Sequence, residues 1–178
     1  MVRALFFVLA TFVISCRPPP PPSGPVANFY EVDPGVFRSA QPTTPEAWAY
    51  IKSRGVRTIV KLNDDSEGSD AGAEALGLEV VRVSIPPKGD LVGVFERPDP
   101  SKLVVAIAAL ERGEVLVHCT HGQDRTGLVV GLYRVLHDHR KKSEAYREMR
   151  AHGFHPELLG LLDTWEDFDG VTIGSLSE

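Results

Sequence analysis

The sequence predicts a single α/β domain whose central sheet is mostly parallel, has about four to five strands and is flanked by helices. Three observations lead to this prediction. Short apolar segments alternate with helical segments, as expected of a parallel sheet covered on both faces. The length of 178 residues suits one domain with terminal tails. The hydrophobic content of 43% matches a globular protein with a core.

The N-terminal residues 1–15 resemble a signal peptide that precedes the domain. Arg3 supplies a short positive start, and the next 11 residues, Ala4 to Ile14, are almost all apolar. Such a run is too short to cross a bilayer as a helix, but it has the length of a signal-peptide core. An uncleaved anchor and an ordinary secretory peptide are the alternative interpretations.

Cys16 ends this segment in a context that resembles a bacterial lipobox, Val13-Ile14-Ser15-Cys16. In such signals the cysteine is lipidated and becomes the mature N-terminus, and its acyl chains bind the membrane. We therefore expect an extracytoplasmic protein that is lipid-anchored to a bacterial membrane, on its periplasmic face. Arg17, a non-acidic residue after the cysteine, resembles the signal for an outer-membrane destination.

Residues 16–27 are predicted to be a linker between the lipid and the domain. The five prolines from Pro18 to Pro22 fix φ and favour an extended spacer. A docking site for a proline-binding domain is the alternative. The domain itself is expected to cover residues 28–170, with a C-terminal tail at 171–178.

The domain is predicted to begin with two strands, 29–32 and 36–39, on either side of the tight turn Asp33-Pro34-Gly35. Thr44 can cap the first helix, which has Pro45 in its first position and runs to about residue 54.

A short apolar strand is expected at 58–62, followed by a polar loop at 63–70. The next helix, 71–76, ends at Gly77, and the segment 79–84 is predicted to be another strand.

The connection 85–100 holds four prolines and two glycines, and loops of this length inside a compact domain are often functional. Ser101 can cap a helix at 101–112, and the apolar segment 115–118 has the character of a buried strand. Three helices complete the prediction, at about residues 126–139, 143–152 and 156–168.

Composition excludes some functions. The net charge of −5 argues against a general nucleic-acid binder, because such a protein needs a basic surface to neutralise phosphates. The two cysteines are Cys16 and Cys119, so lipidation of the first leaves no internal disulfide. The histidines show no ligand spacing, so no metal is predicted.

One segment carries a pattern with a chemical meaning, His118-Cys119-Thr120-His121-Gly122-Gln123-Asp124-Arg125-Thr126-Gly127. It lies between a predicted strand and a predicted helix. Successive backbone N–H groups of such a loop can converge on an anion, and the helix adds the positive end of its dipole. The predicted phosphate-binding residues are Thr120, His121, Gly122, Gln123, Asp124 and Gly127.

The field that binds phosphate also stabilises a thiolate, so Cys119 is predicted to be an ionised nucleophile. Arg125 can hold two phosphoryl oxygens with its planar guanidinium. Thr126 can donate a hydrogen bond to the sulfur as it departs. His118 is expected to orient the loop rather than to react. The alternative is a buried thiol at a strand end, with Arg125 on the surface.

This segment resembles the HC-x5-R-[ST]-G signature of the protein tyrosine and dual-specificity phosphatases. The segments 37–42 (FRSAQP), 146–149 (YREM) and 153–155 (GFH) resemble the compact bacterial branch of that family, which includes periplasmic tyrosine phosphatases and is related to atypical dual-specificity enzymes of fungi and plants. The resemblance covers roughly residues 28–169. It implies a protein-tyrosine-phosphatase-like fold, a phosphocysteine intermediate and no metal or organic cofactor.

The resemblance also implies an aspartic acid that protonates the leaving oxygen. Asp90 lies 29 residues before Cys119 (119 − 90), inside the long connection, and this spacing is similar to that of the family. Asp99 is the rival, although Asp99-Pro100-Ser101 also fits the start of a helix. Asp64 and Asp65, which follow a neighbouring strand, remain further candidates.

The expected function is hydrolysis of phosphomonoesters, on phosphotyrosine or phosphoserine/threonine proteins or, as the alternative, on inositol polyphosphates. Asp124 favours phosphoproteins, because a carboxylate beside the site weakens the attraction for polyanions; its side chain could instead point outward or bond the backbone. A sulfurtransferase and an inactive phosphate-binding module are less favoured. The expected partners are a phosphorylated substrate and, through the lipid, a membrane, with no nucleic acid.

Overall fold

The computed structural model describes residues 24–85 and 96–168. The predicted signal peptide, the lipidation site Cys16, the general-acid candidate Asp90 and the tail 171–178 lie outside the described residues. Within them, no helix combines the length and the apolar character that crossing a bilayer requires.

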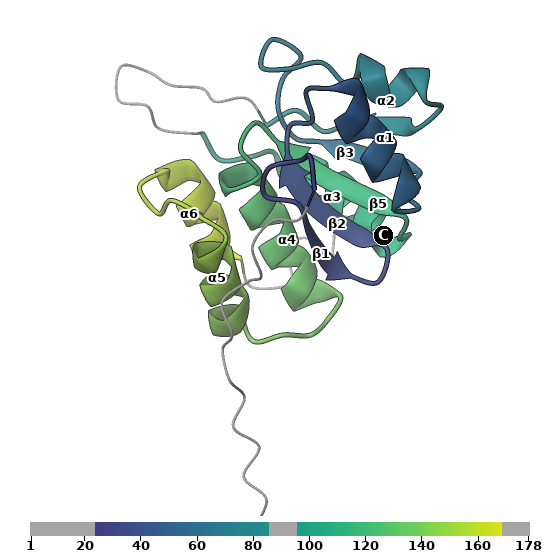
Figure 1. Ribbon diagram of the computed structural model, residues 1–178. Helices are drawn as coiled ribbons and strands as arrows, with labels where there is room; N and C mark the ends of the chain where they lie inside the picture. The colour runs from purple at the N-terminus through teal and green to yellow at the C-terminus, as the bar shows by residue number, and fades with distance from the viewer. Residues whose placement is uncertain (1–23, 86–95, 169–178) are drawn as a thin grey trace, which may run out of the picture.

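A five-stranded sheet forms the centre of the molecule, in the order β1-β2-β5-β3-β4 (Figure 1). Its strands are β1 (Tyr30–Asp33), β2 (Val36–Ala40), β3 (Thr58–Lys61), β4 (Glu79–Arg82) and β5 (Val115–Cys119). β1 pairs antiparallel with β2, and the other three pairings are parallel. The mostly parallel sheet predicted from the sequence is therefore confirmed.

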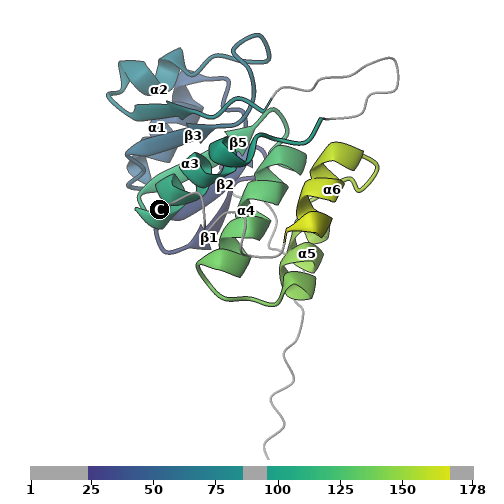
Figure 2. The same cartoon turned by 180° about the vertical axis from the view of Figure 1, so that it is seen from behind.

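Helices cover both faces of the sheet, as Figures 1 and 2 show from opposite sides. The helices are α1 (Pro45–Ser53), α2 (Ala71–Ala75), α3 (Pro100–Glu111), α4 (Asp124–Leu136), α5 (Lys142–Ala151) and α6 (Leu159–Asp167). α1 and α2 pack on one face and the other four on the opposite face, with α4 central among them.

Alternate residues of the middle strands point into two separate cores. Leu116 of β5 and Ile59 of β3 face the core under α1 and α2, whereas Val117 and Val60 face the larger core under α3 to α6. Because side chains alternate along a strand, a strand buried on both faces is mostly apolar. This explains the apolar run 115–117 with which β5 begins.

Several helix boundaries differ from the prediction by two or three residues. Asp99, not Ser101, caps α3, because its carboxylate accepts a hydrogen bond from the Ser101 N–H while Pro100 occupies the first turn. α4 begins at Asp124, two residues early, directly out of the loop. α6 begins at Leu159 instead of Pro156.

Candidate active site

Cys119 is the last residue of β5, and the loop after it leads directly into α4. The thiol is 2% exposed. Gly122 has φ +70°, and a Cβ there would lie 2.4 Å from the carbonyl carbon and oxygen of Ser39. The end of β2 therefore touches the loop so closely that only glycine fits.

Arg125 turns inward from the first turn of α4 and is buried. Its Nη1 and Nη2 donate to the two carboxylate oxygens of Glu67, at 2.8 and 2.7 Å, and Nη2 also donates to the Thr120 hydroxyl at 2.9 Å. Nη1 further donates to the Ile85 carbonyl at 3.1 Å. The surface position of Arg125 that the sequence left open is thus excluded.

Glu67 links the guanidinium to the loop, because it also accepts a hydrogen bond from the Thr120 hydroxyl at 2.7 Å. Hydrogen bonding to Arg125 holds the pKa of Glu67 well below its ordinary value of 4.5, at about 2. Glu67 is therefore an anion at any physiological pH. It can fix the guanidinium, but it cannot supply a proton.

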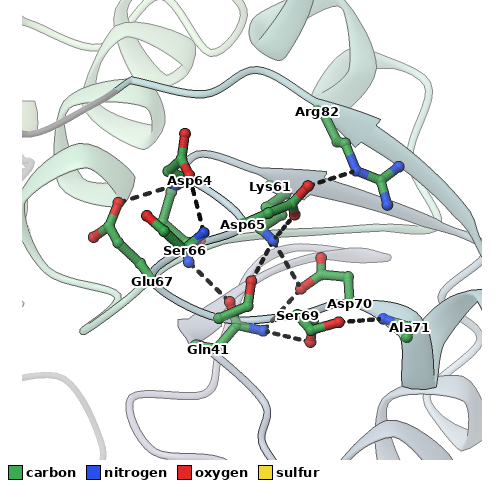
Figure 3. A network of polar contacts seen from close by, with 12 residues as sticks. Gln41, Lys61, Asp64, Asp65, Ser66, Glu67, Ser69, Asp70, Ala71 and Arg82 are labelled. Carbon is green, nitrogen blue, oxygen red and sulfur yellow. Dashed lines mark hydrogen bonds and ion pairs between the residues drawn. The ribbon is translucent and has the colours of Figure 1, made fainter.

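The loop 63–70 that carries Glu67 is organised around Lys61, as Figure 3 shows. Lys61 is 1% exposed, and its Nζ donates to Asp65 Oδ1 and to the Gly68 carbonyl, both at 2.5 Å. Asp70 Oδ1 lies 3.9 Å from the same nitrogen. A buried ammonium surrounded by three oxygens fixes the path of the loop.

His118 lies beneath the loop, wholly buried, and its Nε2 is 2.9 Å from Asp70 Oδ2. Asp70 is also bonded by the Gln41 side chain, at 2.8 Å. This arrangement suits the orienting role predicted for His118, because the carboxylate fixes the ring that immediately precedes Cys119. Asp70 is a supporting residue that the sequence interpretation did not identify.

Asp124 turns away from the anion site. Its Oδ1 accepts hydrogen bonds from the His155 backbone N–H at 2.8 Å and lies 2.9 Å from His155 Nδ1. The outward, structural interpretation is the one observed: Asp124 connects the start of α4 to the segment between α5 and α6. The Thr126 hydroxyl, by contrast, is buried and has no hydrogen-bond partner among the described residues. It remains available to a sulfur or phosphoryl oxygen.

The three general-acid candidates that the structure describes make contacts that do not suit a proton donor. Asp99 bonds Ser101 at the start of α3, and these hydrogen bonds lower its pKa. Hydrogen bonds from Ser66 lower the pKa of Asp64, and Asp65 pairs with Lys61. An acid that donates a proton near neutral pH needs the opposite shift. These contacts argue against Asp99, Asp64 and Asp65 as the acid, whereas Asp90 lies outside the described residues and stays a prediction.

No group of three or more histidine, cysteine or acidic side chains that could hold a metal ion occurs in residues 24–85 and 96–168. The functional residues that the sequence interpretation missed are Glu67, Asp70 and Lys61. One signal was present: the loop 63–70 follows β3, whose carboxyl end lies beside that of β5 in a parallel sheet.

A family model described as the tyrosine phosphatase family matches residues 25–150 of the chain. Among curated proteins, the dual specificity protein phosphatase TpbA of Pseudomonas aeruginosa is 33% identical over 135 residues, which is 75% of this chain and 58% of the relative. The inositol diphosphatase DSP2 of rice (Oryza sativa subsp. japonica) is 31% identical over 114 residues, 63% of this chain and 55% of the relative. The matches thus span just over half the length of these relatives.

Solved structures share the fold. The crystal structure of P. aeruginosa TpbA superimposes with a TM-score of 0.69 at 22% identity, covering 89% of this chain and 96% of that chain. The core catalytic domain of the PP-IP phosphatase SIW14 from S. cerevisiae gives a TM-score of 0.66 at 19% identity, covering 89% and 93%.

Proposed function

The chain belongs to the tyrosine phosphatase family, and from that premise we propose that it hydrolyses phosphomonoesters through a phosphocysteine intermediate on Cys119. The observation that carries the proposal is the position of Arg125. Glu67 and Thr120 hold its guanidinium inward, beside the loop that begins at Cys119. A fixed cation next to a buried thiol is what transfer of a phosphoryl group to sulfur requires.

In the first step the Cys119 thiolate attacks phosphorus in line, the bond to the ester oxygen breaks, and an acid protonates that oxygen. In the second step water attacks the phosphocysteine and gives a proton to the carboxylate that acted as the acid, the S–P bond breaks, and inorganic phosphate leaves as the thiolate re-forms. Arg125 and the loop N–H groups stabilise the phosphoryl oxygens in both steps. The Thr126 hydroxyl can hydrogen-bond the departing sulfur.

Asp90 is the proposed general acid. Ile85, at the start of the connection that contains Asp90, bonds Arg125 through its carbonyl at 3.1 Å. Five residues of extended chain reach at most about 18 Å, so the chain length allows a residue five positions beyond Ile85 to reach the site. Asp90→Asn should lower kcat by about 100-fold or more and remove the basic limb of the pH–rate profile. A full basic limb in this variant would exclude Asp90.

The proposed substrates are phosphoproteins that present one phosphate at a time. In the described part of the chain, Glu67 places its carboxylate beside the loop and pairs with Arg125, a cation that faces the site. Asp124, expected from the sequence to weaken the attraction for polyanions, is turned away and adds nothing to this argument. Lys61, the last residue of β3, does not add to this positive charge, because Asp65, Gly68 and Asp70 enclose its ammonium group. A polyphosphate would need several free cations around the loop.

Inositol polyphosphates are the second candidate, because rice DSP2 is named an inositol diphosphatase and matches at 31% identity. Phosphate release should be compared for a phosphotyrosine peptide and inositol hexakisphosphate, under reducing conditions and without metal. Preferential turnover of the peptide would support a protein phosphatase. Preferential turnover of the inositol phosphate would overturn the charge argument.

Cys119→Ser provides the mechanistic control, because the hydroxyl keeps the size of the side chain but is a poor nucleophile. The variant should bind a phosphopeptide and release no phosphate. Unchanged turnover would exclude Cys119 as nucleophile, and thiosulfate-dependent thiocyanate formation by the wild type would point to a sulfurtransferase instead.

Lipidation at Cys16 is proposed from the sequence of residues 13–16 and lies outside the described residues. Acyl chains would hold the domain at a bacterial membrane, through the proline-rich linker. Expression in a Gram-negative host with an alkyne-labelled fatty acid tests this. Label should enter the wild type and be absent from Cys16→Ala, and the wild type should fractionate with membranes.

A further inference from the structure

Three successive carbonyls of the Cys119 loop are each bonded from outside by the segment 28–41. The backbone N–H of Gln41 donates to the Thr120 carbonyl at 3.2 Å. Asn28 Nδ2 donates to the His121 carbonyl at 2.8 Å, and Arg38 Nη2 donates to the Gly122 carbonyl at 2.8 Å. The loop is thus bound along its outer edge by residues far away in the sequence.

Because peptide units are planar, the hydrogen bonds at the outer edge of the loop also determine which groups face its inner edge. All peptide bonds of the described residues are trans, so the N–H of each peptide unit points away from its C=O. Holding the carbonyls of Thr120, His121 and Gly122 outward therefore turns the next three N–H groups inward. Those N–H groups, of His121, Gly122 and Gln123, donate to no other described residue.

The segment 28–41 is itself firmly placed. β2 pairs in parallel register with β5, which sets Ala40 beside Cys119. The Ala40 N–H donates to the Ala27 carbonyl at 2.9 Å, which brings Asn28 up against the loop. Asn28 has φ +53°, a left-handed conformation that asparagine tolerates better than most residues.

Arg38 is an unusual residue to find in such a place, because it is 1% exposed and its Nε and Nη1 have no hydrogen-bond partner among the described residues. Burial lowers the pKa of Arg38 to about 10, whereas negative charge on Cys119 and Glu148 raises it. The guanidinium therefore remains a cation at neutral pH. A buried cation bonded to the outer side of the loop stabilises negative charge at its inner side.

We propose that Asn28 and Arg38 are positioning residues that hold the loop carbonyls outward, so that the N–H groups of Gly122 and Gln123 are aimed at a bound oxyanion before it arrives. The link to turnover rests on the proposed phosphatase function, but anion binding does not. Each side chain orients one peptide unit: Asn28 fixes the direction of the Gly122 N–H, and Arg38 fixes the direction of the Gln123 N–H. Preorganised donors bind an anion without a cost of reorganisation.

The first test uses the full chain and tungstate, an oxyanion that is not hydrolysed. Asn28→Asp replaces the donor by an oxygen of the same size, which repels the His121 carbonyl. We expect the Kd for tungstate to rise about tenfold or more, with little change in Tm. The control is Ala27→Asp, which adds the same charge one residue away, at an exposed position, and should change Kd less than about twofold.

The second test is local and does not depend on the stability of a buried variant. In the wild type, tungstate should shift the amide proton resonances of Gly122 and Gln123 downfield. Asn28→Asp should diminish the shift at Gly122. Arg38→Met should diminish it at Gln123, and Arg38→Lys, which keeps a donor and the charge, should restore part of it.

The outcomes separate this inference from the proposed function. If tungstate binds and responds to Asn28→Asp as expected but no phosphomonoester is hydrolysed, the positioning role stands and the enzymatic proposal fails. If the wild type turns over substrate while folded Asn28→Asp binds tungstate with wild-type affinity, the positioning role is overturned. Absence of tungstate binding to the wild type overturns it as well.

Discussion

Glu67 is the side chain whose removal should change the site most directly without touching the nucleophile. It holds both terminal nitrogens of Arg125 and the Thr120 hydroxyl. Glu67→Gln keeps the shape, but it turns an amide N–H₂ toward the guanidinium. We expect kcat/KM to fall by about 10- to 100-fold, the effect of losing a hydrogen bond to a charged group. Glu74→Gln, at a surface pair with Arg82, is the matched control and should leave kcat/KM unchanged.

The same pair makes stability depend on pH. The pKa of Glu67 is lowered from 4.5 to about 2 by Arg125, so the folded state loses this proton more readily than the unfolded state. The stabilisation is complete above pH 4.5 and is lost as the pH falls toward about 2. In urea titrations, the difference in unfolding free energy between wild type and Glu67→Gln should be constant near neutral pH and shrink over this acid range. A constant difference across that range would contradict the assignment.

The pKa of His152 should lie far below that of an ordinary histidine. Burial, together with the charges of Arg38 and Arg134, lowers its pKa from 6.5 to about 4, and its ring contacts the Tyr30 ring. Since the unfolded chain takes up this proton first, folding stability should decline as the pH falls from 6.5 toward 4. The imidazole resonances of His152 in an NMR titration give the midpoint directly. A midpoint near 6.5 would show that the ring is not desolvated.

At the scale of the elements, the loop 63–70 behaves as a unit organised by one buried cation. Lys61→Met keeps an unbranched side chain, one atom shorter, and removes the charge that Asp65, Gly68 and Asp70 surround. We expect KM to rise at least about fivefold, because Glu67 no longer has a fixed path to Arg125, and stability to fall by about 3–5 kcal/mol. Lys52→Met, an exposed lysine that bonds the Leu76 carbonyl, is the control. Equal effects of the two substitutions would contradict this role.

At the scale of the whole molecule, two leucines that look alike in the sequence should contribute unequally to stability, because one lies in a core and the other is exposed. Leu116 is fully buried between β5 and the helices α1 and α2, whereas Leu159 is 50% exposed at the start of α6. Leu116→Ala should lower the unfolding free energy by about 2–5 kcal/mol, and Leu159→Ala by about 0.5 kcal/mol or less. Chemical denaturation measures both. Similar losses for the two would contradict the description of the cores.

The sequence predicted the family, the α/β class and the mostly parallel sheet, and these predictions are confirmed. They could be made because the relevant signals are local: periodicity along strands, caps, and a ten-residue segment that contains Cys119 and Arg125. The supporting contacts could not be predicted in this way. Glu67 meets Arg125 across 58 positions, and Asn28 meets His121 across 93. Nothing in the local pattern specifies such pairs until the strand order is known.

The position of β2 between β1 and β5 has a consequence for when the anion site exists. β2 leaves the ribosome about eighty residues before its partner β5. The two strands can pair only after both have been synthesised. Until β5 and the loop after it have paired with β2, the carbonyls of Thr120, His121 and Gly122 cannot reach the groups of the segment 28–41 that hold them. The anion site is therefore completed only when the sheet closes.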